Sequence, residues 1–177
     1  LLPATTFSPT GRVRGGTEIV ITDGGRPGAA ILPGLAEGRR VIAVDLFGTG
    51  EASTTFQEPM LLACAGQRPL GIQTAQLLAV ATWASRRYRS SSVHLRAAGR
   101  SMPLVAQLAT ALEPSRFSSL TTYAALDSLD HLVDLPVRYA DHAGLFCFGL
   151  LAEFDIPDLL QLSSPVPLID AARGPLR

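Results

Sequence analysis

Residues 93–112, VHLRAAGRSMPLVAQLATAL, contain the local unit that decides the fold class. Val93 to Ala97 predict a β-strand, and Leu104 to Leu112 predict a helix that ends before Pro114. Between them lies the turn GRSMP at residues 99–103, which follows the strand and opens the helix. A strand that leads through a tight turn into a helix is typical of α/β domains with a parallel sheet.

The clearest helix elsewhere is predicted over residues 71–87. Arginines occupy its last turn, where cations suit the helix dipole. Its core-facing side is expected to be an apolar stripe at helical spacing, formed by Ile72, Ala75, Leu78 or Ala79, and Trp83.

Strand-like and helix-like segments alternate along the rest of the chain. Residues 142–154 predict a third helix, and residues 51–69, which contain two prolines, predict a long loop. The fold class expected is therefore α/β, with a mostly parallel sheet flanked by helices in a single domain over residues 1–177. Further strands are predicted at residues 18–22, 40–45, 118–123 and 166–169.

Composition and charge exclude several classes of function. The 177 residues are 47% apolar and 17% charged, their formal net charge is zero, and the arginines are scattered, so no field is present to bind a nucleic acid. The longest apolar stretch, residues 144–152, is about half of the ~20 residues that a bilayer span requires, and no basic-then-apolar leader opens the chain. We therefore expect a cytoplasmic protein with neither a membrane nor a nucleic acid as partner.

All 15 basic residues are arginine, because the sequence contains no lysine. This excludes a Schiff-base lysine, a phosphate-loop lysine and the Tyr-x-x-x-Lys pair of short-chain dehydrogenases. A nucleotide-binding domain remains an alternative, since one strand ends at Asp23 and Asp45 closes the next about 20 residues later, as a ribose-binding carboxylate would. Its glycines do not fit G-x-G-x-x-G, and Pro27 stands where the helix would begin. Neither a cofactor nor a metal is expected.

The turn at residues 99–103 is the strongest candidate for chemistry. It matches G-x-S-x-G except that Pro103 replaces the last glycine, and proline is tolerated in the first turn of a helix. In that motif the serine hydroxyl stands clear of the sheet, and the next backbone N–H points at the developing oxyanion. Ser101 is thus a candidate nucleophile. On pattern alone, a serine in this place is more often an N-cap that only stabilises the helix.

Four further segments resemble motifs of one family, in that family's order. Residues 45–51, DLFGTGE, resemble D-x-x-G-x-G-[ES], and residues 23–25, DGG, resemble an oxyanion loop usually written with His-Gly-Gly. Residues 2–9 resemble the first strand, x-x-A-x-x-F-x-P, and residues 154–169 resemble the segment leading into the strand that carries the acid. Over nearly its whole length the chain therefore resembles the α/β-hydrolase fold, and more narrowly bacterial acetyl xylan esterase-like and dienelactone hydrolase-like proteins. A sheet of this fold normally extends beyond both ends of this chain, so terminal elements are expected to be missing.

The resemblance implies a serine carboxylester hydrolase that acts on small-molecule esters by acyl transfer. Ser101 would be the nucleophile, and Asp170 would be the acid that orients the base. The oxyanion hole would be formed by the N–H of Met102 together with an N–H near Gly24 or Gly25.

The catalytic base is the difficulty, because no histidine follows Asp170. His94 lies inside a predicted strand, and the other two histidines lie in segments expected at the surface. An alternative order places Asp127 or Asp130 after the nucleophile and then His142, which keeps the Ser-Asp-His sequence. His142 is the candidate base.

A hydrolase-like domain without catalysis is the main alternative. Asp23 stands where the family has histidine, and a carboxylate beside the oxyanion site disfavours the developing negative charge. A serine without a base loses on the order of 10³ or more in rate. Such a domain would serve binding or assembly, and an uncovered sheet edge would be closed by a second copy of the chain or by a partner chain.

Overall fold

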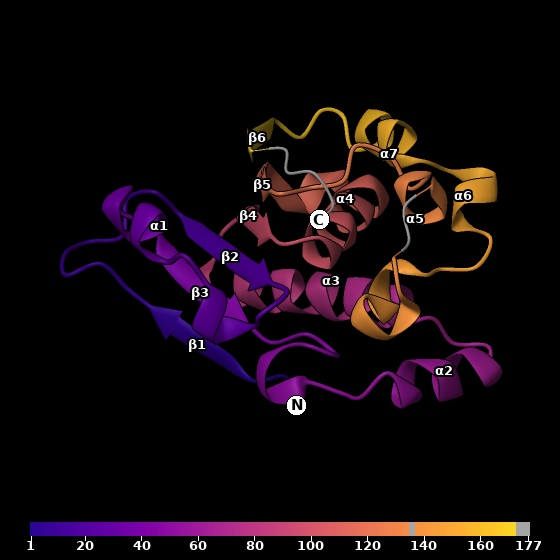
Figure 1. The fold of residues 1–177 in the computed structure, drawn as a ribbon. Coiled ribbons are helices and arrows are strands. Elements are labelled where there is room, and N and C mark those ends of the chain that lie inside the picture. Colours follow the sequence, from indigo (N-terminus) through magenta and orange to yellow (C-terminus); the bar gives the residue numbers. More distant parts are fainter. Residues whose placement is uncertain (135–136, 173–177) are drawn as a thin grey trace.

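A mostly parallel sheet of six strands forms the centre of the computed structural model, which describes residues 1–134 and 137–172 (Figure 1). Of residues 141 and 170–172 it describes the backbone alone. The strand order is β1-β3-β2-β4-β5-β6; β1 is antiparallel to β3, and every other neighbouring pair is parallel. The strands are β1 (Ala4–Phe7), β2 (Thr17–Thr22), β3 (Arg40–Val44), β4 (Val93–Ala98), β5 (Phe117–Tyr123) and β6 (Leu168–Ala172).

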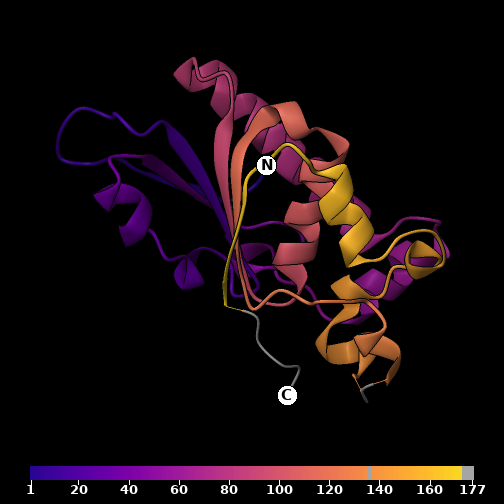
Figure 2. The same cartoon turned by 90° about the horizontal axis from the view of Figure 1, so that it is seen from above.

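Helices cover both faces of the sheet. Figure 2 shows α3, α4 and α7 on one face and α1 on the other. None of the helices within the described residues is both long and apolar enough to cross a lipid bilayer. The α-helices are α1 (Leu32–Ala36), α2 (Gln57–Cys64), α3 (Pro69–Tyr88), α4 (Ser101–Leu112), α5 (His131–Asp134), α6 (Leu150–Glu153) and α7 (Ile156–Leu162). Short 3-10 turns are η1 (Arg26–Gly28), η2 (Gly50–Ala52), η3 (Pro114–Arg116), η4 (Tyr139–Asp141) and η5 (Ala143–Leu145).

The side chains of strand β4 alternate between the two faces of the sheet. Val93, Leu95 and Ala97 are fully buried in the core on the side of α3 and α4. Because side chains alternate along a strand, His94 and Arg96 point to the opposite face. The apolar half of this strand therefore supports the helix layer in which α4 begins.

A buried ion pair joins β2 and β4 on that opposite face. Glu18 is 1% exposed, and its Oε1 accepts hydrogen bonds from Nε and Nη2 of Arg96 at 3.0 and 2.9 Å. Nη1 of Arg39 lies 3.4 Å from the same oxygen. Helix α1 packs directly on this carboxylate, since a Cβ on Gly34 would lie only 1.9 Å from Oε2. The pairing offsets part of the cost of burying both charges, since Oε2 of Glu18 has no hydrogen-bond partner among the described residues.

Replacing Arg96 by methionine is expected to destabilise the protein by about 3 kcal/mol, because it leaves the Glu18 carboxylate buried with only the longer contact to Arg39. The double variant Glu18→Gln/Arg96→Met removes both charges and should recover most of that loss. Urea denaturation gives the free energies of unfolding. A double variant no more stable than Arg96→Met would contradict this account.

The predicted α/β fold class is confirmed, with a mostly parallel sheet. All five strands predicted from the sequence are present, and the helices predicted at residues 71–87 and 104–112 are α3 and α4. The predicted stripe of α3 is wrong: Trp83 is 47% exposed, and the buried face instead includes Gln73, Thr74 and Leu77. Polar side chains can lie on this face because they bond to backbone carbonyls, Gln73 to Phe47 and Thr74 to Leu70.

Two predictions about connecting segments are also wrong. Residues 142–154 do not form one helix but contain η5 and the short α6, because Gly149 adopts a left-handed conformation with φ of 87°. Residues 51–69 are not a continuous loop, since they contain α2. Pro59 fits the first turn of α2, where its missing N–H leaves no helical hydrogen bond unmade, and Pro69 is the first residue of α3.

Candidate functional site

Ser101 lies at the carboxyl-terminal edge of the sheet, as the first residue of α4 shortly after the end of β4. The reversal between the two elements depends on Gly99, whose φ of 111° is rarely adopted by residues with a side chain. A Cβ on Gly99 would also lie 2.3 Å from Cγ of Asp23. The structure thus places Ser101 at a strand-to-helix corner, and glycine leaves room there for a carboxylate.

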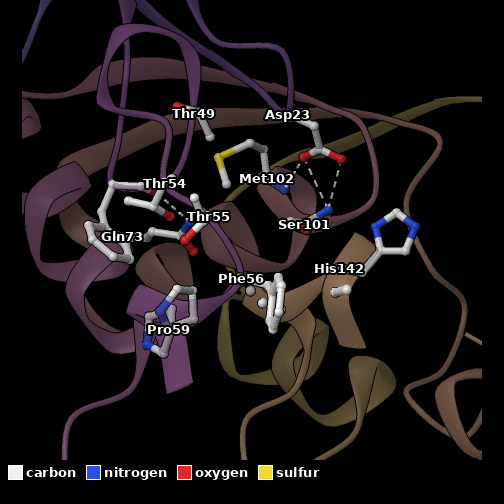
Figure 3. A pocket seen from close by; sticks show the side chains of 16 residues that line it. Asp23, Thr49, Thr54, Thr55, Phe56, Pro59, Gln73, Ser101, Met102 and His142 are labelled. Carbon is white, nitrogen blue, oxygen red and sulfur yellow. Dashed lines mark hydrogen bonds between the residues drawn. The ribbon is translucent and has the colours of Figure 1, made fainter. Parts of the chain in front are cut away.

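That carboxylate belongs to Asp23, which follows β2 and accepts the backbone N–H groups at the start of α4 (Figure 3). Oδ2 lies 2.6 Å from the nitrogen of Arg100, and Oδ1 lies 3.2 Å from that of Ser101 and 3.0 Å from that of Met102. The first N–H groups of a helix have no partner inside the helix, and the helix dipole favours an anion at this end. Asp23 satisfies both requirements from a different strand.

This contact occupies an N–H group that the sequence assigned to the oxyanion hole. The N–H of Met102 donates to Asp23, so an acyl oxygen can reach it only after the carboxylate moves away. On the other side of the expected hole, Gly25 donates its N–H to the carbonyl of Thr22 at 2.9 Å, and Gly24 lies in the same turn. The N–H groups of Gly25 and Met102 are therefore both engaged within the chain, and neither is free for an oxyanion as the structure stands.

His142 lines the same pocket as Ser101, as its candidacy for the base requires. Its Nε2 lies 3.2 Å from Nη1 of Arg100. A guanidinium only donates hydrogen bonds, so this contact is a hydrogen bond in the tautomer of His142 that carries its proton on Nδ1 and leaves Nε2 as the acceptor. No imidazole nitrogen among the described side chains is hydrogen-bonded to the Ser101 hydroxyl.

The remaining candidates lie elsewhere or outside the described side chains. His94 contacts the Ser119 hydroxyl at 2.8 Å on the opposite face of the sheet; burial and the Arg39 charge lower its pKa. Asp127 lines a separate cavity beside α7. The side chain of Asp170 lies outside the described residues, so its role as the acid stays a prediction.

The alternative acid, Asp130, is not among the residues that line the Ser101 pocket. It lies just before α5, where its N–H donates to the Ser128 hydroxyl at 3.0 Å. No three His, Cys, Asp or Glu side chains among those described come together as metal ligands.

The pocket over Ser101 has a volume of about 230 Å³ (Figure 3). One wall comes from residues 54–56 and from α2, a second from residues 140 and 142–144, and Gln73 of α3 also lines the pocket. Gln73 was not predicted from the sequence, because the predicted stripe of α3 contains apolar residues alone. The overlooked signal is a glutamine four residues before Leu77, in register with the buried face of the helix.

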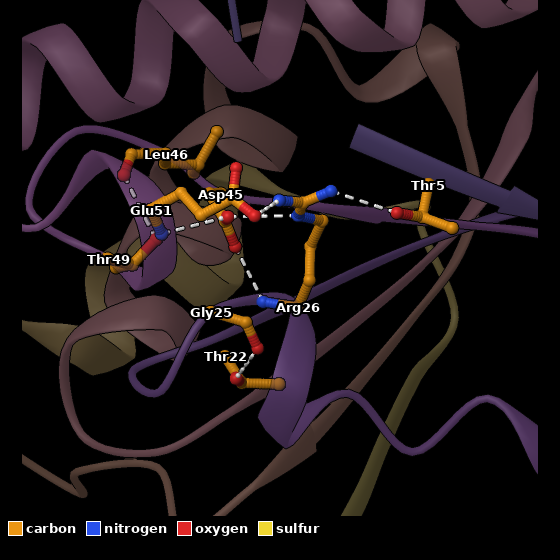
Figure 4. A network of polar contacts seen from close by, with 8 residues as sticks. All are labelled: Thr5, Thr22, Gly25, Arg26, Asp45, Leu46, Thr49 and Glu51. Atoms are coloured by element: carbon orange, nitrogen blue, oxygen red, sulfur yellow. Dashed lines mark hydrogen bonds and ion pairs between the residues drawn. The ribbon is translucent and has the colours of Figure 1, made fainter. Parts of the chain in front are cut away.

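Asp45 anchors two loops near this pocket, one after β2 and one after β3 (Figure 4). Oδ1 accepts the backbone N–H of Arg26 at 2.6 Å, and Oδ2 accepts Nε of Arg26 at 2.9 Å and the backbone N–H of Glu51 at 3.0 Å. Arg26 also bonds the Thr5 hydroxyl at 2.9 Å and pairs with the Glu51 carboxylate at 2.5 Å. A fully buried and fully engaged Asp45 does not face a ligand as a ribose-binding carboxylate would.

The contacts of Asp45 set its ionisation. Burial alone would raise the pKa of Asp45, but the N–H groups of Arg26 and Glu51, together with the Arg26 guanidinium, outweigh burial and lower it. A carboxyl whose pKa is lowered in the folded state stabilises the fold above its unfolded pKa of about 3.9. That contribution is lost as the pH falls through the folded pKa.

The variant Asp45→Asn is expected to lose about 2 kcal/mol of stability at pH 7, because it removes a charge that accepts three hydrogen bonds. Between about pH 5 and pH 2 the stability of wild type should fall more steeply than that of the variant. Urea denaturation across this range measures both slopes, with the exposed Glu153→Gln as the matched control. Equal slopes for wild type and Asp45→Asn would refute the assignment.

Solved structures with the same architecture identify the fold. A protein of Bacteroides fragilis proposed to be an acetyl xylan esterase superposes with a TM-score of 0.79 at 15% identity, over 97% of this chain and 55% of that one. A thermostable carboxyl esterase of Bacillus coagulans in complex with glycerol gives 0.55 at 15% identity, over 76% and 43%. Est1E of Butyrivibrio proteoclasticus with bound ferulic acid gives 0.52 at 15% identity, over 70% and 49%.

The chain therefore has the α/β-hydrolase fold, and it spans about half the length of these solved structures. No protein-family model matches the sequence, and a search of curated proteins gives no match. At 15% identity the likeness concerns the fold, so the chemistry of the pocket is argued from its own residues.

Proposed function

We propose that this chain carries a serine carboxylester hydrolase site with Ser101 as the nucleophile. The observation that carries the proposal is the position of Ser101, which opens α4 at the carboxyl edge of β4 and lines the 230 Å³ pocket. Parallel α/β sheets bind ligands at this edge, and a serine at such a corner presents its hydroxyl to them. Esterases with the same fold support a small-molecule ester as the substrate.

The proposed reaction is acyl transfer in two steps. Oγ of Ser101 attacks the ester carbonyl carbon while its proton passes to a base, and the tetrahedral intermediate expels the alcohol. Water then hydrolyses the acyl-serine by the same route. His142 is the candidate base because it lines the pocket, although its Nε2 lone pair must first leave Arg100. Asp170 on β6 is the candidate acid.

The Asp23 carboxylate makes this a slow hydrolase. For the oxyanion to reach the N–H of Met102, Asp23 must give up at least its hydrogen bond to that nitrogen. Hydrogen bonds to charged groups contribute about 1.5–3 kcal/mol each. A loss of this size in the transition state lowers the rate by about 10–10².

The same observation favours a second candidate, a pocket that binds a small molecule without turning it over. Asp23 already fills the positive end of α4, and the lone pair of His142 is directed at Arg100. In this alternative Ser101 is an ordinary first residue of a helix, and the fold serves recognition.

The variant Asp23→Ala separates the two candidates, because it frees the N–H groups of α4. We expect hydrolysis of p-nitrophenyl acetate to rise by about tenfold or more, and a fluorophosphonate probe to label Ser101 faster than in wild type. Adding Ser101→Ala to this variant should abolish both signals. Mass spectrometry of the labelled peptide identifies the modified residue.

The control for folding is Asp23→Asn, whose one amide oxygen can still accept from the nitrogens of Ser101 and Met102, while its NH₂ group replaces the oxygen that accepts from Arg100. Its thermal stability should lie between that of wild type and that of Asp23→Ala, which should lose about 1 kcal/mol. Hydrolysis that survives Ser101→Ala would refute the role of Ser101. Absence of labelling in a folded Asp23→Ala variant would favour the binding candidate.

A further inference from the structure

One buried acceptor in the Ser101 pocket has no partner. Gln73 of α3 is 4% exposed, and its Oε1 makes no hydrogen bond within the described part of the chain. The residue is one of those that line the pocket (Figure 3). Buried polar atoms are nearly always paired, so an orphaned oxygen beside a cavity indicates a group that a ligand supplies.

The orientation of this amide is fixed by its other end. Nε2 of Gln73 lies 2.7 Å from the carbonyl oxygen of Phe47, and Oε1 of Gln76 lies 2.8 Å from the nitrogen of the same residue. A carbonyl only accepts hydrogen bonds, so the NH₂ group of Gln73 must face it. Flipping the amide would bring two oxygens together, which leaves Oε1 as the atom available to the pocket.

The Gln73 amide and the nucleophile lie within van der Waals distance of one common point. A Cβ placed on Gly144 would lie 3.6 Å from Oε1 and 3.7 Å from Nε2 of Gln73, and 3.8 Å from Oγ of Ser101. Glycine keeps that point empty on the wall formed by residues 140 and 142–144. A ligand whose ester carbonyl contacts Ser101 therefore brings its neighbouring atoms within reach of Gln73.

The geometry points to Gln73 as a specificity-determining residue that accepts a hydrogen bond from a hydroxyl group of the ester substrate. This inference rests on the proposed function, because it places the ester at Ser101. The hydroxyl is carried either by the acyl part or by the alcohol part of the ester. In both cases an ester without a hydroxyl leaves the Gln73 oxygen unpaired and binds more weakly.

Binding is measured on the Ser101→Ala protein, so that the result does not depend on turnover. The probes are ethyl acetate, 2-hydroxyethyl acetate with a hydroxyl on the alcohol part, and ethyl glycolate with a hydroxyl on the acyl part. Titrations followed by amide NMR shifts should give at least one hydroxylated ester a dissociation constant about fivefold lower than that of ethyl acetate. The hydroxylated ester that binds more tightly than ethyl acetate identifies which part of the substrate faces Gln73.

Adding Gln73→Met, which keeps the length of the side chain but removes the acceptor, should abolish this preference. Gln76→Met is the matched control. It removes the hydrogen bond from the Phe47 N–H to Gln76 but leaves Oε1 of Gln73 in place, so it should retain the preference. Gly144→Ala places a methyl group 3.6 Å from Oε1 without a clash and covers the acceptor, so it should also abolish the preference, which tests the inference if the methionine variant fails to fold.

Equal affinities for the three esters, or a preference that survives Gln73→Met, would overturn the role of Gln73. Loss of the preference in Gln76→Met would overturn it as well, since the preference would then depend on the hydrogen bonds that hold the Phe47 peptide and not on the Gln73 oxygen. A hydroxyl preference with no hydrolysis in either wild type or Asp23→Ala would leave this inference standing and reject the proposed function. Ser101-dependent hydrolysis without a hydroxyl preference would do the reverse.

Discussion

The contact between the Asp23 carboxylate and the first N–H groups of α4 ties together the two strands that form the centre of the site. Asp23 follows β2, and α4 begins just after β4, the neighbouring parallel strand. The carboxylate neutralises the positive end of a helix whose N-terminal residues are largely buried. It also occupies the N–H group of Met102, which the proposed oxyanion hole would need. A single side chain thus stabilises the turn and opposes the proposed chemistry.

A second carboxylate repeats this arrangement at the end of β3. Asp45 collects backbone N–H groups from Arg26 and Glu51, just as Asp23 collects them from α4. Both carboxylates therefore accept hydrogen bonds that hold turns at the carboxyl edge of the sheet. Among the described side chains of the pocket, a buried acceptor without a protein partner is the neutral amide oxygen of Gln73. The pocket is accordingly suited to a ligand that donates hydrogen bonds.

Local pattern sufficed for the sheet and for the corner that carries Ser101, because strand, turn and helix are adjacent in sequence. The sequence also indicated that Asp23 would disturb an oxyanion site. It did not reveal that the carboxylate would bind the N–H of Met102, since that contact depends on the register between β2 and β4. The burial of Gln73 could not be predicted for a related reason: this polar side chain is accommodated on the buried face of α3 by a hydrogen bond to the carbonyl of Phe47, which is distant in sequence.

The account depends most on Asp23 holding the start of α4, and amide hydrogen exchange measures this directly. The first N–H groups of a helix lack helical partners and ordinarily exchange fast. We predict that the amide protons of Ser101 and Met102 are protected in wild type and exchange at least about tenfold faster in Asp23→Ala, while those in the middle of α4 change little. Unprotected amides in wild type, or equal rates in the two proteins, would contradict the account.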